Sequence, residues 1–299
     1  MQLADKTLAA IEQEGVATQC GTFREALGKV IMDSPDAYRG QETSSHRGHL
    51  GASQLGQECD RALWYNFHWA KESKFDARML RLFNRGHLEE PRFIAMLMSI
   101  GCTIKQVDEN GKQYRISHGA FIGGSGDGIG LGIPDVPKGS ECLLEFKTHG
   151  EKSFLKLTKA GVRNAKPEHY IQMVLYMHKM NIDYGLYMAV NKNTDELHAE
   201  IIIRNDLMAE HYFERGMRIV HGSIPARISK EPTTFGCRYC DFVDVCHNNA
   251  PIEVSCRTCV HAEASEEHSS WVCNKRRVKL SKSTQAVGCS DYEQVLLSF

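Results

Sequence analysis

The spacing of the apolar residues changes near Gly101, and this change constrains the fold more than any other feature of the 299-residue sequence. Before it, apolar residues in "QLGQECDRALWYNFHWA" and "DARMLRLFNRGHLEEPRFIAMLMSIG" recur at helical spacing, and Gly101 is typical of a helix end. After it, apolar and polar residues alternate in "CTIKQV" and "KQYRI", around the hairpin-type pair Asn110-Gly111. Pro91 either kinks the second helix or begins a new one.

The remaining segments complete an α/β pattern. The sequence predicts a strand at "CLLEFK", a helix over about 167–180, strands at "YGLYMAV" and "LHAEIII", and a helix near 207–220. Two short helical patterns come first, near 3–11 and 23–32. This order is typical of a central mixed sheet flanked by helices. We therefore expect an α/β fold with a helical preamble at 1–45, a core at 46–250 and a small cysteine-rich metal-binding module at 251–299.

Composition narrows the class of protein. No apolar run approaches the roughly 18–20 residues that span a bilayer, and the first residues, "MQLADKTLAAIEQEG", are acidic where a secretory signal would be basic and then apolar, so we expect a cytoplasmic protein. The formal net charge of −1 argues against a surface that is basic all over, although a local basic groove remains open. Without an export signal, the 11 cysteines are better explained as metal ligands or buried small residues than as disulfides.

The strand "CLLEFK" carries two charged residues among apolar ones. Because side chains alternate along a strand, Leu143, Glu145 and Lys147 share one face. Upstream, Asp127 lies in "GSGDGIG", whose glycines let the backbone pass close to another group. Two carboxylates beside a lysine suit Mg²⁺ or Mn²⁺ and a positioned water, as metal-assisted phosphodiester hydrolysis requires. The alternative is a Glu–Lys pair on the wet face of an edge strand.

These residues resemble the core motif of the PD-(D/E)XK nucleases, with Asp127 as the first acid and Glu145-Phe146-Lys147 as the E-x-K element. Two further stretches, in the same order, are similar to motifs of RecB-type and phage lambda-type exonucleases. They are "RGHLEEPRF", which resembles the G-x-x-x-E element, and "YIQMVLYM", which resembles the Q-x-x-x-Y element. The resemblance covers roughly residues 50–250 and implies a restriction-endonuclease-like core.

The resemblance also implies roles for the residues of these two stretches. Glu90 would complete the metal shell from a helix. Gln172 and Tyr176, at i and i+4 on one helix face, would hold a DNA phosphate or the catalytic lysine. His87, one turn before Glu90, is a second choice of ligand. Alternatively, Glu89 and Glu90 are an ordinary solvated pair and Tyr176 is a core aromatic.

The stretch "CRYCDFVDVC" has three cysteines at C-x₂-C-x₅-C spacing, whereas a tetrahedral site or a cubane cluster needs four. In the iron–sulfur subset of RecB-like nucleases, which includes CRISPR-associated ones, the fourth lies far upstream, and "CDRALWY" resembles that element. The resemblance thus implies a structural [4Fe–4S] cluster bound by Cys59, Cys237, Cys240 and Cys246. Alternatively, Cys59 is a buried helix residue and the later three pair with a cysteine of the tail.

The tail holds a second group of four cysteines, for which we find no family resemblance: Cys256, Cys259, Cys273 and Cys289. Four thiolates so close in sequence suit Zn²⁺, which would stabilise a segment poor in core-forming residues, and His261 and His268 are alternative ligands. The basic stretch "CNKRRVKLSK" either contacts phosphate or is a solvated loop. We expect the other three, Cys20, Cys102 and Cys142, to be buried or inert thiols.

Together these features predict a metal-dependent DNA exonuclease that acts on DNA ends or single strands, in recombination, repair, replication or CRISPR spacer processing. The G-x-x-x-x-G-K-[ST] loop does not occur, so unwinding would need a partner. By resemblance, partners besides DNA are a helicase, a single-strand annealing protein or the CRISPR integration machinery. Two other functions stay open: a non-catalytic nucleic-acid-binding module, disfavoured by the intact Asp127, Glu145 and Lys147, and a site-specific endonuclease, disfavoured by the Q-x-x-x-Y and cysteine elements.

Overall fold

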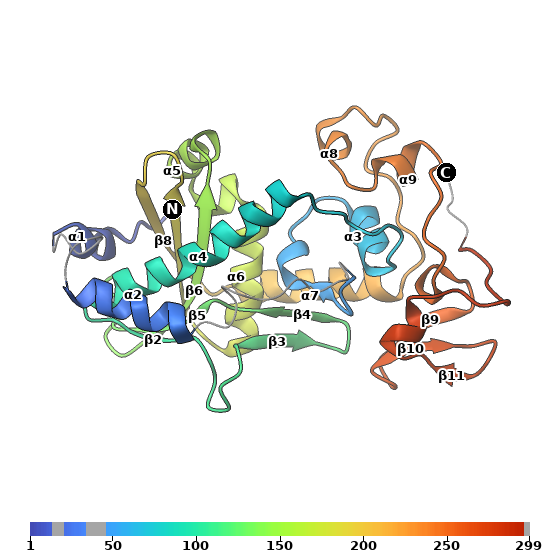
Figure 1. Ribbon diagram of the computed structural model, residues 1–299, viewed down its shortest axis with the longest axis horizontal. Coiled ribbons are helices and arrows are strands. Elements are labelled where there is room, and N and C mark those ends of the chain that lie inside the picture. Colours follow the sequence, from blue (N-terminus) through green and yellow to red (C-terminus); the bar gives the residue numbers. More distant parts are fainter. Residues whose placement is uncertain (14–20, 34–45, 296–299) are drawn as a thin grey trace. The chain divides into compact units, whose positions relative to one another are not determined.

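The computed structural model describes residues 1–13, 21–33 and 46–295, and the chain divides into two compact units (Figure 1). Unit 1 comprises Met1–Glu42, Phe75–Ile116 and Ser125–Ala209, and unit 2 comprises Thr43–Lys74, Ser117–Gly124 and Glu210–Phe299. Each unit is therefore assembled from segments that are far apart in the sequence. The boundaries expected after residues 45 and 250 stay predictions. None of the described helices is long and apolar enough to cross a membrane.

Unit 1 is built on a five-stranded mixed sheet with the strand order β2-β5-β6-β7-β8. The strands are β2 (Thr103–Lys105), β5 (Gly128–Leu131), β6 (Glu141–His149), β7 (Tyr184–Asn191) and β8 (Leu197–Ile203). β6 and β7 run parallel, and the other neighbouring pairs are antiparallel. The predicted α/β class with a central mixed sheet is confirmed, as are the strands predicted at "CLLEFK", "YGLYMAV" and "LHAEIII".

Helices cover both faces of this sheet. On one face, α4 (Ala77–Ser99) packs against β6, where Phe93 stacks on Phe146 with ring centroids 5.0 Å apart. On the other face lies α6 (Pro167–Met180), preceded in the chain by α5 (Glu151–Ala165). The two predicted N-terminal helices are confirmed as α1 (Asp5–Gln13), against β8, and α2 (Gly21–Asp33), against α4. The core of unit 1 lies between α2, α4 and the sheet.

Local sequence signals explain most helix boundaries. The carboxylate of Asp76 accepts a hydrogen bond from the N–H of Met79 at 2.7 Å and begins α4, which continues through the buried Pro91 as one helix. The predicted α6 begins with Pro167 at its first position and ends at Asn181, whose φ of 55° is left-handed. α5 was not predicted, because Gly161 interrupts its periodicity with a non-helical φ of 74°.

The predicted hairpin around Asn110-Gly111 is wrong beyond its turn. Gly111 has the expected positive φ of 70°, and Val107 and Gln113 form an antiparallel bridge. The flanking strands then separate, because β2 pairs with β5, whereas β3 (Arg115–His118) pairs with β4 (Ile122–Ser125). Non-local pairing therefore outweighs the local turn signal.

Unit 2 combines short helices with two small groups of strands. Its helices are α3 (Asp60–Phe67), most of α7 (Asp206–His221), α8 (Phe235–Arg238), α9 (Val243–His247) and α10 (Lys282–Gln285), and its 3₁₀ turns are η2 (Ala52–Gln54) and η3 (Cys256–Thr258). β1 (Leu50–Gly51) pairs with β4 in parallel. In the tail, β9 (Ala262–Ser265), β10 (Ser270–Cys273) and β11 (Val278–Lys279) form an antiparallel sheet.

The core of unit 2 is organised around Arg257, which is only 2% exposed. Its guanidinium lies 3.8 Å from the ring centroid of Trp69 and 4.9 Å from that of Trp271. It donates hydrogen bonds to the carbonyl oxygens of Phe67, at 2.7 Å, and Gly48, at 3.0 Å. The segment after residue 250 thus shares its core with residues 48–69.

Candidate functional site

The aspartate of the glycine-rich turn lies beside the Glu-x-Lys strand in unit 1. β5 pairs with β6 so that Gly128 stands opposite Leu144, and Asp127 Oδ2 accepts a hydrogen bond from the N–H of Phe146 at 2.9 Å. Gly128 has a φ of 151°, and a Cβ there would stand 2.9 Å from the carbonyl oxygen of Lys105. Glycine is therefore required at the position that places Asp127.

Glu145 is fully buried on β6, and both of its oxygens accept hydrogen bonds. Lys147 Nζ donates to Oε1, and Gln172 Nε2 of α6 donates to Oε2 at 3.0 Å. The alternative of a solvated pair on an edge strand is wrong, since β6 is the central strand of the sheet. Tyr176, one turn after Gln172, is buried too, and a Cβ on Gly126 would lie 3.6 Å from its ring. Gln172 thus holds the glutamate, and Tyr176 packs against the turn that carries Asp127.

Burial and mutual repulsion alter the ionisation of these groups. Burial raises the pKa of Asp127 well above its ordinary value, and the charges of Glu145 and Glu90 add to that rise. Burial also raises the pKa of Glu145, although Lys147 opposes the effect. At Lys147, burial favours the neutral amine, but the neighbouring carboxylates outweigh it and raise the pKa above its ordinary value. Lys147 is therefore an ammonium ion at neutral pH.

Glu90 lies at the rim of this group, half-buried on α4, where its charge raises the pKa of both Asp127 and Glu145. Its Oε1 is 3.5 Å from Nδ1 of His87, which is more exposed. Glu89 is buried and forms an ion pair with Arg92 at 3.0 Å. The two glutamates are therefore not a solvated pair: Glu89 is paired with Arg92, and Glu90 acts on the carboxylates of the site.

A hydrogen-bonded chain that the motifs did not indicate continues the site. Tyr187, opposite Glu145 in the pairing of β6 with β7, has its hydroxyl 2.9 Å from His149 Nε2 and 2.9 Å from His169 Nδ1. Burial lowers the pKa of His149 to about 4 and that of His169 to about 3, and nearby lysines add to both effects. Both imidazoles are thus neutral. A signal existed, because His149 shares the strand face of Lys147 and His169 comes one turn before Gln172.

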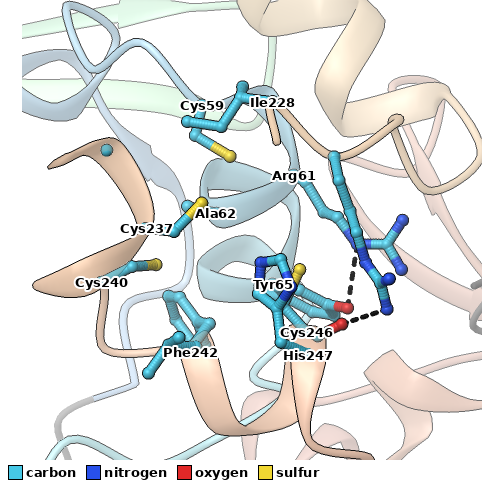
Figure 2. Close-up of a pocket in the computed structure, with 13 residues that line it drawn as sticks. Cys59, Arg61, Ala62, Tyr65, Ile228, Cys237, Cys240, Phe242, Cys246 and His247 are labelled. Carbon is cyan, nitrogen blue, oxygen red and sulfur yellow. Dashed lines mark hydrogen bonds between the residues drawn. The ribbon is translucent and has the colours of Figure 1, made fainter. Parts of the chain in front are cut away.

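In unit 2, the four cysteines of the predicted cluster line one pocket with an empty volume of about 310 Å³ (Figure 2). Cys59 is the N-cap residue of α3, Cys237 lies in α8, Cys240 follows it, and Cys246 lies in α9. Figure 2 shows their sulfur atoms directed towards the same space. Burial raises the pKa of Cys59 and Cys240, and neighbouring cysteines add to both rises. The pocket is otherwise largely apolar, with Ala62, Tyr65, Ile228, Phe242 and Val243 in its wall.

The tail cysteines are also neighbours. Burial raises the pKa of Cys256, and Cys289, Cys259 and Cys273 all contribute to the rise. Cys273 ends β10 opposite Ala262, and the N–H of the next residue, Asn274, donates to the carbonyl oxygen of His261 at 2.8 Å. Of the two alternative ligands, His268 has its Nδ1 2.9 Å from the hydroxyl of Ser265. His261 Nε2 is buried, makes no hydrogen bond to any described residue and lies 3.4 Å from a carboxylate oxygen of Glu293.

The remaining cysteines lie apart from these groups. Cys102 and Cys142 are buried in the core of unit 1, as expected, and burial raises the pKa of Cys102 to about 11. Cys20 lies outside the described residues.

Across residues 1–13, 21–33 and 46–295, no three His, Cys, Asp or Glu side chains are gathered closely enough to hold a metal ion. The carboxylate group and the two cysteine groups are therefore neighbours that lack a ready-made coordination shell. Their donor chemistry nevertheless fits metals. Glu90, Asp127 and Glu145 share one ammonium group, that of Lys147, so they outnumber the cations of the site. Four thiols that line an apolar pocket match the ligands of an iron–sulfur cluster.

No family model and no curated relative matches the sequence. Among solved structures, the chain is similar to an alkaline exonuclease (LHK-Exo) from Laribacter hongkongensis, with 18% identity over 58% of this chain and 87% of that chain and a TM-score of 0.41. For the same exonuclease in complex with dAMP, the identity is 15% over 57% of this chain and 86% of that chain, with a TM-score of 0.38. For the protein SSO0001, the identity is 13% over 75% of this chain and 94% of that chain, with a TM-score of 0.38. At such low identities and TM-scores, these likenesses leave the function to be inferred from the residues of the chain itself.

Proposed function

We propose that the protein is a metal-dependent DNA nuclease whose active site contains Glu90, Asp127, Glu145 and Lys147. The observation that carries the proposal is the meeting of Asp127 and the Glu145–Lys147 pair at neighbouring strands, with one carboxylate fully buried. Burial raises the pKa of both acids and neighbouring carboxylates add to the rise, while Lys147 only partly offsets it, so a further cation would stabilise the charged site. A phosphodiester substrate matches this chemistry, because it brings negative charge that a cation and an ammonium group can share.

The residues then divide the work as follows. Held by Glu90, Asp127 and Glu145, Mg²⁺ or Mn²⁺ would polarise the phosphoryl oxygen and lower the pKa of an attacking water. Lys147, whose pKa the neighbouring carboxylates raise in the metal-free site, would orient that water and stabilise charge on the phosphate. Gln172 fixes Glu145 through Oε2, and the N–H of Phe146 fixes Asp127.

The resemblance of the four motifs supports a finer proposal. The enzyme is an exonuclease that acts on DNA ends or single strands in the cytoplasm, during recombination, repair, replication or CRISPR spacer processing. DNA is its substrate. A helicase, a single-strand annealing protein or the CRISPR integration machinery would supply unwinding or use the product.

The test compares linear DNA labelled at its ends with covalently closed circular DNA of the same sequence. With Mg²⁺ or Mn²⁺ we expect progressive loss of the linear DNA, survival of the circle and full inhibition by EDTA. Cutting of the circle at fixed positions would instead identify a site-specific endonuclease. Binding without cleavage of any DNA, single-stranded or double-stranded, in either metal would favour the non-catalytic binding module.

We further propose that Cys59, Cys237, Cys240 and Cys246 hold a [4Fe–4S] cluster with a structural role. The shared apolar pocket supports this assignment, and the cluster would close a long loop between Cys59 and the other three ligands.

The tail cysteines, Cys256, Cys259, Cys273 and Cys289, are proposed to bind one Zn²⁺. The test uses the full chain, since Arg257 ties the tail to Phe67 and Gly48. Elemental analysis should find zinc in the wild type, less of it in Cys273→Ala, and an unchanged amount in Cys102→Ala. Equal zinc contents in all three proteins would refute this site.

A further inference from the structure

Cationic side chains gather at the edge of unit 1 where its two parallel strands end. β6 ends at His149 and β7 at Asn191, and the N–H of the next residue, Lys192, donates to the carbonyl oxygen of His149 at 2.9 Å. Arg85 of α4 donates to the carbonyl oxygen of Lys192 at 3.1 Å. Lys166 stands at the junction between α5 and α6. Carboxyl ends of parallel strands are the usual ligand-binding edge of an α/β sheet.

Acidic residues such as Glu168 and Glu196 lie near this edge, but neither forms an ion pair with its lysines. After burial, the largest influences that lower the pKa of His149 are the charges of Lys166, Lys147 and Lys192, so three ammonium groups act on one imidazole. Lys147 has Glu145 as its partner. Among the described residues, neither Lys166 nor Lys192 has a carboxylate within ion-pair distance, although the charge of Glu168 acts on Lys166. Like charges held together disfavour one another and favour a bound anion.

The imidazoles of His149 and His169, on which these lysines act, carry no charge of their own. His149 and His169 are neutral and share the hydroxyl of Tyr187. One ring nitrogen of each imidazole faces that hydroxyl, and Nδ1 of His149 lies 3.2 Å from the hydroxyl of Ser153. Because both rings are neutral, the lysines are the charged groups that an anion would meet. The edge continues the carboxylate site along β6, since His149 lies four residues, roughly 13 Å, beyond Glu145.

We propose that Lys166 and Lys192, with Arg85 at the rim, bind a backbone phosphate of the DNA strand next to the phosphate that is cut. The proposal rests on the proposed nuclease function and adds a subsite to it. In this proposal the phosphate that is cut lies at the carboxylates beside Lys147, and Lys166 and Lys192 bind a neighbouring phosphate. A phosphate contact of this kind fixes the register of the strand and carries no sequence preference.

The test measures the binding of a fluorescently labelled single-stranded oligonucleotide by anisotropy at several salt concentrations, with Ca²⁺ in place of Mg²⁺ to suppress cleavage. In Lys166→Ala and in Lys192→Ala, affinity should fall roughly fivefold, and the slope of log K against log salt should shrink by about 0.7 per lysine removed. Lys166→Arg should retain most of the affinity, because the charge is kept. Lys159→Ala, at an exposed position of α5, is the matched control and should leave the slope unchanged.

In steady-state cleavage, KM should rise in the two lysine variants by more than kcat falls. An unchanged salt slope in the double variant, or the same loss in Lys159→Ala, would overturn the subsite. If thermal unfolding shows that Lys166→Ala or Lys192→Ala does not fold as the wild type does, the glutamine variant at the same position is used in its place. The two assays distinguish the failure of one proposal from the failure of the other. If the lysine variants have reduced salt slopes but the wild type cleaves no DNA, the nuclease function is refuted and the phosphate site is kept. If the wild type cleaves DNA but the lysine variants have unchanged salt slopes, the phosphate site is refuted and the nuclease function is kept.

Discussion

Asp127 sits where its negative charge is disfavoured, because burial and Glu145 both raise its pKa. A raised folded-state pKa means that the destabilisation is absent below the unfolded-state pKa and fully present above the folded-state pKa. Asp127→Asn, which keeps an oxygen for the N–H of Phe146, should therefore stabilise the metal-free protein. We expect the unfolding midpoint in EDTA at pH 8 to rise by about 2–4 °C and the gain to shrink as the pH falls towards about 4.

Differential scanning calorimetry checks this prediction, with Asp183→Asn as the control, because the side chain of Asp183 is 75% exposed. A gain that is equal at both pH values, or no gain at pH 8, would show that the carboxylate is not strained by its surroundings. The same variant should lose DNA cleavage, since stability and function oppose each other at such a site.

Some residues of the carboxylate site could be predicted from the sequence, and others could not. Glu145 and Lys147 followed from strand alternation, and Gln172 and Tyr176 from helical spacing together with the motif resemblance. Tyr187 could not be predicted, because its place beside Glu145 depends on the parallel register of two strands about 40 residues apart. Its contact with His149 and His169 follows from that register.

At the scale of the elements, Arg257 links the 3₁₀ turn of the tail to the segment around α3. Burial lowers its pKa to about 9, a cost that three aromatic faces and its hydrogen bonds offset. Arg257→Ala leaves the carbonyl oxygens of Phe67 and Gly48 without their donor, and we expect it to destabilise unit 2 by about 3 kcal/mol or more.

Tryptophan fluorescence during denaturation reports this change, because all 3 tryptophans, Trp64, Trp69 and Trp271, lie in unit 2. Arg276→Ala is the control, since that arginine is exposed and pairs with Asp291 at the surface, and it should shift the midpoint little. Equal denaturation midpoints for the Arg257 and Arg276 variants would mean that the contacts of Arg257 with its three aromatic neighbours do not stabilise unit 2.

Elements were predictable where local and non-local preferences agree. α6 has a helix-starting proline and a left-handed residue at its end, so its predicted bounds are confirmed. α5 escaped prediction because Gly161 breaks its period, and the structure compensates through Glu200, whose Oε1 accepts the N–H of Val162 at 2.8 Å. The compensating residue lies two strands further along the chain, where no local pattern points to it.

At the scale of the whole molecule, the two units interleave along the chain. The cysteine pocket of unit 2 joins residues that precede the sheet of unit 1 with residues that follow it. Periodicity predicted most elements of unit 1 in their order, although not α5, but it could not show that residues 43–74 and 210–299 form a unit of their own. That information lies in contacts such as those between Arg257 and Gly48.

The cysteine pocket of unit 2 predicts an iron–sulfur cluster that can be detected in the whole protein. Protein purified without oxygen should be brown and contain about four irons per chain. Cys59→Ala should lose the colour and much of the thermal stability, because the link between the early and late segments of unit 2 is gone. Cys102→Ala, in the core of unit 1, should keep its iron. Full iron content in Cys59→Ala with loss in Cys102→Ala would mean that the fourth ligand is assigned wrongly.

If the Glu145–Lys147 pair on β6 serves DNA hydrolysis, removal of the lysine must abolish cleavage. Wild type and Lys147→Ala are assayed side by side for Mg²⁺-dependent cleavage of end-labelled linear DNA and, in Ca²⁺, for binding of the same DNA. We predict that the variant loses on the order of 10²–10³-fold or more in cleavage rate and keeps most of its affinity, because an ammonium group that acts in the transition state is removed. A variant that cleaves as fast as the wild type would contradict the account.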